Sequence, residues 1–399
     1  MNKVPVTVLS GYLGSGKTTL LNHLLHNKRD MRIAVIVNDM GEINIDANLV
    51  ANTGGLDQTD EQLVELSNGC ICCTLREDLL IEVEKLVKKG GIDYIVIEST
   101  GISEPIPVAQ TFSYIDSELG IDLTEICRLD TMVTVVDAHR FLKDFQSGDK
   151  LLDRKQEVGE TDDREIADLL IDQIEFCDVL ILNKIDLVTE EEKIKLKQVL
   201  TSLQPEALLI ETTHAEVEPE CLLNTHRFDF EKVSDSAGWI QELTAGHHEH
   251  TPETEEYGIS SFVYHRRLPF HPQRFHDWMN KMDAAIIRAK GIVWLSNYHT
   301  VACLFSQAGP SVDIQPITFW VDAMSERAKH QIISERPDVL EEWDIEYGDR
   351  HTKFVIIGIN LDQEAITQSL DACLVNFDEM NQDWTQFDNP YGWNIRQPE

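Results

Sequence analysis

The chain is poor in basic residues. Its 399 residues include 34 Lys and Arg against 70 Asp and Glu, which gives a formal net charge of −36 at pH 7. Such an excess of negative charge repels the phosphates of nucleic acids and anionic membrane surfaces. We therefore expect neither nucleic acid nor a membrane as a partner, and a cation is a better candidate.

Long apolar runs, internal repeats and low-complexity tracts are missing as well. No stretch approaches the roughly 20 apolar residues that a membrane-spanning helix needs. The N-terminus carries a strand-like segment in place of a cleavable signal, so we expect a cytoplasmic protein. A hydrophobic content of 42% can build a large core, and the length favours two or three domains.

Short apolar runs alternate with helical patterns in the first half of the chain. The runs at 4–9, 32–37, 94–97, 132–136, 179–182 and 207–210 are typical of buried parallel strands. This alternation predicts an α/β domain over residues 1–222, in which a mostly parallel sheet carries helices on both faces. In such sheets ligands bind at the carboxyl ends of the strands.

The pattern changes after residue 222. Residues 223–256 are polar and predict a linker, and strand-like segments follow at 259–264, 301–306 and 354–359. We expect residues 257–399 to form a smaller α+β domain.

The first apolar run leads directly into GYLGSGKT, the pattern of a phosphate-binding P-loop. Its glycines let backbone N–H groups turn toward phosphate oxygens, and the helix that follows adds the positive end of its dipole. Lys17 would neutralise the outer phosphates, and the Thr18 hydroxyl would bind Mg²⁺. The predicted phosphate-binding residues are Gly11, Gly14, Ser15, Gly16, Lys17, Thr18 and Thr19.

The sequence NKID at 183–186 follows another apolar run and predicts a loop that reads guanine. The Asp186 carboxylate can accept from the ring N–H and the exocyclic amine of guanine, whereas adenine would leave it unpaired. Asn183 and Lys184 would complete this site. A solvated loop is the alternative for so short a motif, but the P-loop upstream favours GTP binding, and we expect ATP to bind poorly.

Two further polar segments end apolar runs at the same predicted edge. In ESTG at 98–101, we expect Glu98 near Mg²⁺ and the Gly101 amide near the γ-phosphate. In NDMGE at 38–42, Asp39 and Glu42 could approach the metal or the attacking water. For Asp39 an ordinary turn residue is an equal alternative. The predicted catalytic residues are Lys17, Thr18, Asp39, Glu98 and Gly101.

Three thiols are crowded into four residues, Cys70, Cys72 and Cys73. Thr74 and Glu77 match a capping box, so a helix should begin just after them, and its dipole lowers thiol pKa values. Clustered thiolates need a cation, and Zn²⁺ suits sulfur ligands, with a fourth ligand from elsewhere. A redox pair between the first and last cysteine is the alternative.

Other metal-binding side chains are more scattered. His247, His248 and His250 could collect metal within the linker, or could simply be solvated. The remaining cysteines are expected in the core or as incidental residues, at Cys127, Cys177, Cys221, Cys303 and Cys373.

GYLGSGKT, NDMGE, ELSNGCICCT, ESTG and NKID, in this order and before a C-terminal domain, resemble the CobW-type metallochaperone GTPases. SFVYHRRLPFHPQRF and RAKGIVWL resemble the YciC/ZagA type of that family. The resemblance implies a SIMIBI-like P-loop fold and a zinc-binding GTPase, made under zinc limitation, that hands metal to a client metalloenzyme. Cys70, Cys72 and Cys73 would hold zinc, joined by Glu42, and GTP hydrolysis would gate its release.

Two alternatives from other classes stay open. The protein could be a GTP-regulated zinc buffer without specific transfer. It could also serve cobalt or iron in cofactor or metalloenzyme maturation, because similar ligands bind Co²⁺. The sequence leaves open the identity of the client and whether the chain forms a homo-oligomer.

Overall fold

The computed structural model describes residues 3–28, 31–38, 62–66, 74–113, 121–154, 156, 162, 164–229, 232, 237, 240 and 258–395. The chain divides into two compact units, Met1–Gly238 and Trp239–Glu399. The first unit contains the strands β1 (Val4–Ser10), β2 (Ile33–Asn38), β3 (Gln62–Leu66), β4 (Tyr94–Glu98), β5 (Cys127–Asp137), β6 (Val179–Asn183) and β7 (Leu208–Thr212). Its helices are α1 (Lys17–Asn27), α3 (Thr74–Lys89), α4 (Pro105–Ser113), α5 (Phe141–Phe145), α6 (Ile166–Glu175) and α7 (Glu190–Leu203).

The seven strands of the first unit form one sheet in the order β3-β2-β4-β1-β5-β6-β7. Each pairing that joins them is parallel, as the sequence predicts. All strands therefore end at one edge of the sheet. The last residues of β1, β4 and β6, which are Ser10, Glu98 and Asn183, lie at this carboxyl edge.

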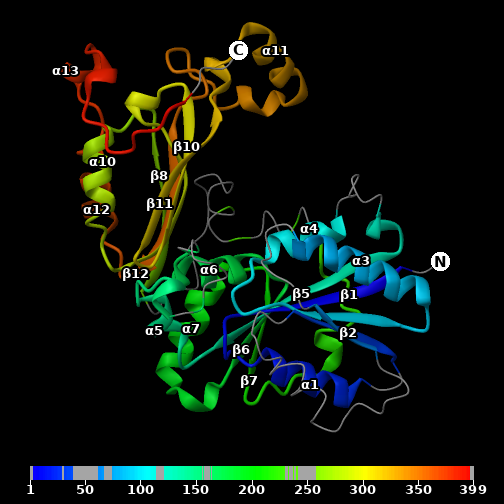
Figure 1. The fold of residues 1–399 in the computed structure, drawn as a ribbon. Helices are drawn as coiled ribbons and strands as arrows, with labels where there is room; N and C mark the ends of the chain where they lie inside the picture. The colour runs from blue at the N-terminus through cyan, green and yellow to red at the C-terminus, as the bar shows by residue number, and fades with distance from the viewer. Residues whose placement is uncertain are drawn as a thin grey trace. The chain divides into compact units, whose positions relative to one another are not determined.

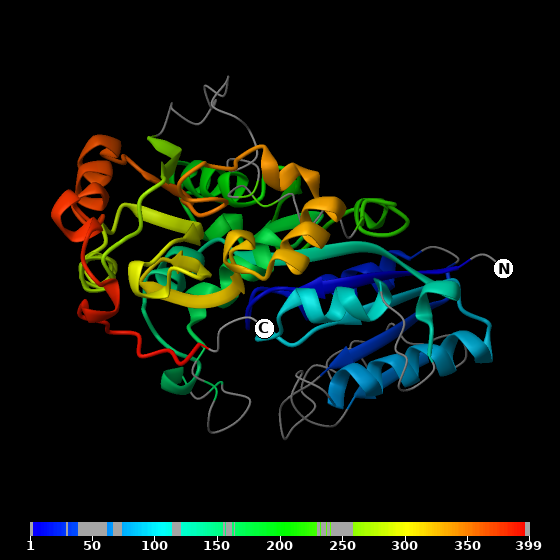
Figure 2. The same cartoon turned by 90° about the horizontal axis from the view of Figure 1, so that it is seen from above.

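Helices cover both faces of this sheet, which explains why its central strands are apolar throughout. On one face Leu20 and Leu24 of α1 pack against Leu9 of β1. On the other face, Leu80 of α3 and Phe112 of α4 belong to a second core cluster. Figure 1 shows α1 on one side of the strands and α3 and α4 on the other. In Figure 2, which is seen from above, the light-blue helix α3 and the cyan helix α4 lie in front of the strands.

The second unit is a five-stranded antiparallel sheet with helices, in agreement with the predicted α+β class. Its strands are β8 (Ile259–Arg266), β9 (Ile286–Val293), β10 (Val301–Ala308), β11 (Ser311–Phe319) and β12 (Thr352–Ile359), in the order β11-β10-β9-β12-β8. The helices are α10 (Pro272–Met279), α11 (Glu326–Glu335), α12 (Gln363–Asp371) and α13 (Phe377–Met380). A core that includes Phe275 of α10 and Leu370 of α12 packs on the sheet. Strands β9 and β11 were not expected from the sequence.

The segment after residue 222 differs from the expected linker. Leu223 is buried, and the Phe228 N–H donates to the carbonyl of Asp130 in β5 at 3.0 Å. The backbone N–H groups of Thr225 and His226 donate to the Asp130 carboxylate at 2.9 and 3.1 Å. Residues 223–229 thus belong to the first unit, where we had expected the linker to begin.

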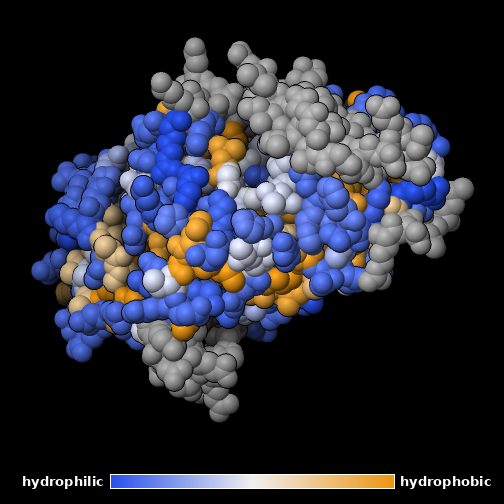
Figure 3. All heavy atoms as spheres, turned by 90° about the horizontal axis from the view of Figure 1, so that it is seen from below, coloured by the Kyte–Doolittle hydropathy of each residue, from blue (hydrophilic) through white to orange (hydrophobic). Residues whose placement is uncertain are grey.

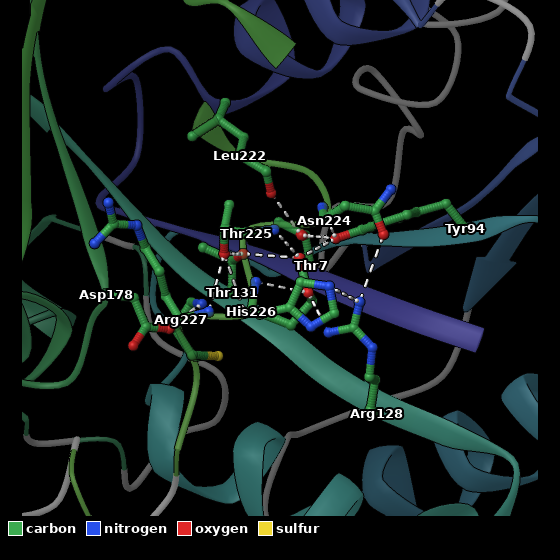
Figure 4. Close-up of polar contacts among 12 residues, drawn as sticks. Thr7, Tyr94, Arg128, Thr131, Asp178, Leu222, Asn224, Thr225, His226 and Arg227 are labelled. Carbon is green, nitrogen blue, oxygen red and sulfur yellow. Dashed lines mark hydrogen bonds and ion pairs between the residues drawn. The ribbon is translucent and has the colours of Figure 1, made fainter. Parts of the chain in front are cut away.

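Asp130 is the centre of this attachment. Its side chain is fully buried and also accepts from the Tyr94 hydroxyl at 2.6 Å and from Arg128. Figure 4 shows Tyr94 and Arg128 turned toward residues 224–226. Burial alone would raise the pKa of Asp130, but the hydrogen bonds outweigh burial and hold this pKa below its ordinary value.

Hydrophilic side chains predominate on the face of the molecule shown in Figure 3. Among the described residues, we find no helix whose length and apolar character would let it cross a membrane.

Candidate nucleotide-binding site

The P-loop connects β1 to α1 and depends on glycine for its shape. Gly11, Gly14 and Gly16 have φ values of 133°, 77° and 114°, a region that L side chains rarely adopt. A Cβ atom on Gly11 would lie 2.3 Å from the carbonyl oxygen of Val135, and one on Gly16 would lie 2.4 Å from Asn183 Nδ2. The loop can therefore approach its neighbours this closely only with glycine at these positions.

Lys17, the first residue of α1, lies inside this loop. It is only 7% exposed, and its Nζ donates to the carbonyl of Gly11 at 2.8 Å and to that of Tyr12 at 3.5 Å. An ammonium group so placed is ready to exchange loop carbonyls for phosphate oxygens.

Thr18 and Glu98 meet at the carboxyl edge, as the sequence predicts. Thr18 Oγ1 donates to Glu98 Oε1 at 2.8 Å, and Glu98 is buried at the end of β4. A hydroxyl beside a carboxylate supplies the hard oxygen ligands that Mg²⁺ prefers, so the two residues fit this ion.

Buried hydroxyl groups near these two residues fit a polar ligand. Ser10 Oγ, Ser15 Oγ and Thr100 Oγ1 are buried without a hydrogen-bond partner in the described part of the chain. Burying a hydroxyl without a partner costs about 1–3 kcal/mol. Three such groups around one loop favour a site where phosphate, Mg²⁺ or water supplies the missing partners.

The predicted base-reading loop is hydrogen-bonded to the P-loop. Asn183 Nδ2 donates to the carbonyl of Ser15 at 2.8 Å, and Asn183 Oδ1 accepts from the N–H of Ala215 at 3.0 Å. Lys184 has a left-handed backbone, and its Nζ donates to the carbonyl of Gly14 at 2.7 Å. Asp186 follows in a short exposed turn, Ile185–Leu187.

The ESTG loop also packs on the P-loop. The backbone N–H and the hydroxyl of Ser99 both donate to the carbonyl of Leu9, at 3.0 and 2.9 Å. A Cβ atom on Gly101 would lie 2.6 Å from the backbone nitrogen of Leu13. The structure thus brings Glu98 and Gly101 to the edge that holds Lys17 and Thr18.

Sequence reasoning missed three residues at this edge. The Asp137 carboxylate, at the end of β5, accepts from Lys184 Nζ at 2.6 Å. Arg140 donates to the carbonyl of Leu13 at 3.5 Å, and Ala215 contacts Asn183 as described above. Asp137 directly follows the apolar run 132–136, so the criterion that selected Glu98 would also have found it.

Several predicted residues lie outside the described part of the chain. They are Asp39, Glu42, Cys70, Cys72 and Cys73, together with His247, His248 and His250. The helix expected after the cysteines is present, because α3 begins at Thr74. The zinc site itself stays a prediction.

The cysteines expected in the core are largely there. Cys127, Cys177, Cys303 and Cys373 are buried, and Cys221 is half-buried. Burial raises the thiol pKa to about 12 at Cys127 and Cys303 and to about 11 at Cys373. Such thiols are poor metal ligands, because the thiolate is the form that binds.

Comparison with known proteins identifies the family of this chain. Residues 5–211 match the family model described as the CobW/HypB/UreG nucleotide-binding domain. This chain belongs to the CobW/HypB/UreG family. Residues 259–374 match the cobalamin synthesis protein cobW C-terminal domain, so both units of this family member have a counterpart.

Its relatives match this chain over most of their own length. Zinc-regulated GTPase metalloprotein activator 1 of Dictyostelium discoideum is 41% identical over 390 residues, which cover 95% of this chain and 81% of that protein. Zinc chaperone CobW of Pseudomonas aeruginosa is 28% identical over 380 residues, covering 93% of this chain and 92% of that protein. Zinc chaperone YjiA of Escherichia coli is 28% identical over 379 residues, covering 92% and 97%.

Proposed function

We propose that this protein is a zinc-binding GTPase that delivers Zn²⁺ to a client metalloprotein, with GTP binding and hydrolysis gating the release of the metal. GTP binding is supported mainly by one observation: two other segments of the carboxyl edge are hydrogen-bonded to the P-loop and the start of α1. Thr18 contacts Glu98 of one loop, and Gly14 and Ser15 accept hydrogen bonds from Lys184 and Asn183 of another. The names of the relatives, two zinc chaperones and a zinc-regulated GTPase, support the zinc-binding part of the proposal.

The chemistry of Asp186 favours guanine. Substituting Asp186→Asn replaces an acceptor by a donor, so GTP should bind at least about tenfold more weakly. Xanthine carries a carbonyl where guanine carries its amine, and the new amide could donate to it. Recovery of binding with XTP would support base reading by Asp186, and equal GTP affinity in the variant and the wild type would contradict it.

Metal and nucleotide would communicate through α3. This helix follows the predicted zinc ligands Cys70, Cys72 and Cys73, and its residues Leu80 and Val83 share a core cluster with Ile97 of β4. Ile97 precedes Glu98, whose carboxylate contacts Thr18. A shift of β4 on hydrolysis would thus reach the first turns of α3 through packed side chains.

Coupling of zinc release to GTP hydrolysis would solve a kinetic problem, because a tight zinc site releases its metal slowly. A picomolar zinc site corresponds to about −16 kcal/mol, and its spontaneous release takes on the order of hours even with association at about 10⁸ M⁻¹s⁻¹. A change of about 3 kcal/mol on hydrolysis would speed release more than about a hundredfold. We place this transfer in the cytoplasm under zinc limitation. Hydrolysis would stay slow until a client completes the site.

The decisive experiment titrates metal-free protein with Zn²⁺ against a competing chelator, with GDP or a nonhydrolysable GTP analogue bound. Wild type is compared with the triple variant Cys70→Ser, Cys72→Ser, Cys73→Ser and with Cys221→Ser, a half-buried cysteine outside the cluster. We expect a nucleotide-dependent affinity that the triple variant loses and Cys221→Ser keeps. Tight binding that ignores the nucleotide would overturn gating, and binding that survives the triple variant would overturn the zinc site.

A transfer assay separates delivery from buffering. Zinc-loaded protein is mixed with an apo client metalloprotein, and client activity is followed with GTP or with the nonhydrolysable analogue. Activation that needs hydrolysable GTP supports a metallochaperone. Equal activation with both nucleotides would indicate a zinc buffer, and activation by Co²⁺ or Fe²⁺ in place of Zn²⁺ would reassign the cargo.

A further inference from the structure

Gln173 is a buried polar side chain that the proposed function does not yet use. It lies in α6 and is only 1% exposed. Its Nε2 donates to the carbonyl of Gly101 at 3.3 Å and to that of Ser103 at 3.1 Å. Both carbonyls belong to the loop that follows Glu98, so a single amide group from α6 holds two points of this loop.

The turn that Gln173 holds also fixes the orientation of the Gly101 amide. The carbonyl of Thr100 accepts from both the N–H of Ser103, at 3.2 Å, and the Ser103 hydroxyl, at 2.8 Å. In a trans peptide the C=O and the N–H point in opposite directions. With the Thr100 carbonyl directed toward Ser103, the N–H of Gly101 must point away from Ser103.

A second side chain completes the restraint. Arg164 donates through Nη1 to the carbonyl of Ile102 at 3.0 Å, and its Nε and Nη2 are both held by the carboxylate of Asp162 at 2.8 Å. Three successive carbonyls, at residues 101–103, are therefore bound by side chains from residues 164 and 173. The loop is clamped from one side by α6 and the residue shortly before it.

The anchor itself is firmly placed. The Thr134 hydroxyl of β5 donates to the backbone carbonyl of Gln173 at 2.6 Å. Gln173 also lines a pocket behind the P-loop together with Tyr12, Leu13 and Ser15. The glutamine thus connects the central strand β5, the P-loop wall and the ESTG loop.

Gln173 achieves this at a cost in stability. Its Oε1 is buried and has no hydrogen-bond partner in the described part of the chain. An unpaired buried acceptor costs about 1–3 kcal/mol, and an apolar side chain of similar volume would avoid that cost. A buried glutamine with an unpaired acceptor is expected where its N–H donors serve function.

We propose that Gln173 is a positioning residue for GTP hydrolysis: it holds the turn of residues 100–103 so that the Gly101 amide stays aligned for the γ-phosphate. This inference rests on the proposed function, which places Gly101 beside that phosphate. Its side-chain amide contacts the carbonyls of Gly101 and Ser103, so its role would be indirect. Its contribution should therefore depend on the γ-phosphate and be absent for GDP.

The test compares Gln173→Met with Gln204→Met. Methionine removes the two donors at nearly constant volume. Gln204 is the matched control, because it is also buried, and its Nε2 donates to a backbone carbonyl, that of Glu175, at 2.6 Å. Steady-state GTP hydrolysis, the affinities for GDP and a nonhydrolysable GTP analogue, and thermal stability are measured for both variants.

We expect Gln173→Met to lower kcat by about 10- to 100-fold, as displaced positioning groups do, with GDP affinity within about twofold of wild type. Gln204→Met should keep kcat within about twofold of wild type, whatever its change in thermal stability. Unchanged kcat in folded Gln173→Met, or an equal loss of kcat in both variants, would overturn the proposal.

A more conservative variant tests the proposal even if Gln173→Met does not fold. Gln173→Asn keeps the amide but withdraws it by one methylene, so kcat should fall less than in Gln173→Met, and a wild-type kcat in this variant would contradict the proposal. Failure of the proposed function looks different. In that case wild type itself would not hydrolyse GTP with Mg²⁺ present, whatever the residue at position 173.

Discussion

Buried polar side chains are hydrogen-bonded differently at the carboxyl edge and at the amino edge of the parallel sheet. At the carboxyl edge, the buried hydroxyls of Ser10, Ser15 and Thr100 have no partner in the described part of the chain. Toward the amino ends of β4 and β5, the buried carboxylate of Asp130 accepts hydrogen bonds from side chains and backbone alike, including the Tyr94 hydroxyl. Both groups are buried and polar.

The difference teaches how a binding edge can be told from a structural one. A buried polar group that is satisfied internally stabilises the fold, whereas one left without a partner keeps its hydrogen-bonding capacity for a ligand. The internally bonded carboxylate of Asp130 attaches residues 223–229 to the sheet. The hydroxyls without a partner surround the P-loop. Substitutions at the two edges should therefore separate activity from stability.

Lys17→Ala should give the largest effect, and it should fall on activity alone. Loss of the ammonium inside the P-loop removes charge stabilisation of the phosphates, so kcat/KM for GTP should fall on the order of a thousandfold, about 4 kcal/mol. Phosphate release measures activity, and urea denaturation measures stability. A comparable drop in the free energy of unfolding would mean that Lys17 is structural.

Asp130→Ala should show the reverse pattern. It leaves several buried donors without their acceptor, so the free energy of unfolding should fall by about 3 kcal/mol while GTP affinity stays unchanged. Tyr94→Phe removes one of those donors and should cost about 1 kcal/mol. If Asp130→Ala weakened nucleotide binding without loss of stability, the contrast between the edges would fail.

Asp178, at the same amino edge, is less completely satisfied than Asp130. Burial raises its pKa to about 6, although the N–H of Met132 donates to it at 2.8 Å. Between pH 4 and 6 the folded protein keeps a proton that the unfolded chain has released. This group therefore lowers stability as the pH rises through that window, by up to about 3 kcal/mol in all, and the change is complete by about pH 7.

Asp178→Asn isolates this contribution, because the amide oxygen can still accept from Met132. The stability advantage of the variant over wild type should grow from pH 4 to about 7 and then stay constant. Chemical denaturation at a series of pH values gives the difference. A difference that is independent of pH would show that the pKa of Asp178 is not raised.

The smallest expected effects come from single hydroxyls. Ser15→Ala should leave the free energy of unfolding unchanged or slightly higher, and should weaken GTP binding by about 1 kcal/mol. Thr131→Val is the matched variant, because Thr131 Oγ1 is bonded to Thr225 Oγ1 at 2.6 Å. It should cost about 1 kcal/mol of stability and leave GTP binding as it is. Equal behaviour of the two variants would remove the distinction between the edges.

The sequence predicted best what is local and repetitive. The run 4–9 became β1, and 179–182 became β6, because strands buried on both faces must be apolar throughout. The placement of the P-loop and of Asn183 and Lys184 at the carboxyl edge was foreseeable because each motif directly follows an apolar run, whereas their contacts with the P-loop were not predicted. The metal site was predicted from three neighbouring cysteines, and it stays a prediction.

Features that depend on distant partners escaped prediction. β5 begins at Cys127 although its apolar run begins at 132, because Asp130 is paired with residues about 95 positions later. β9 contains Arg288, a buried cation whose guanidinium donates to Ser306 and Gln307 of β10. β11 is an edge strand with mostly exposed side chains and Pro316 in its middle, so its alternation is weak.

The buried cysteines have a practical consequence for the bench. Alkylating reagents attack accessible thiolates, and burial withholds both accessibility and charge from Cys127, Cys303 and Cys373. Cys177 is buried as well, which leaves the half-buried Cys221 as the readiest target among the five described cysteines. In a Cys221→Ser background, rapid labelling of the native protein would therefore report on Cys70, Cys72 and Cys73. Added zinc should slow this labelling, so the labelling rate would report metal loading in real time.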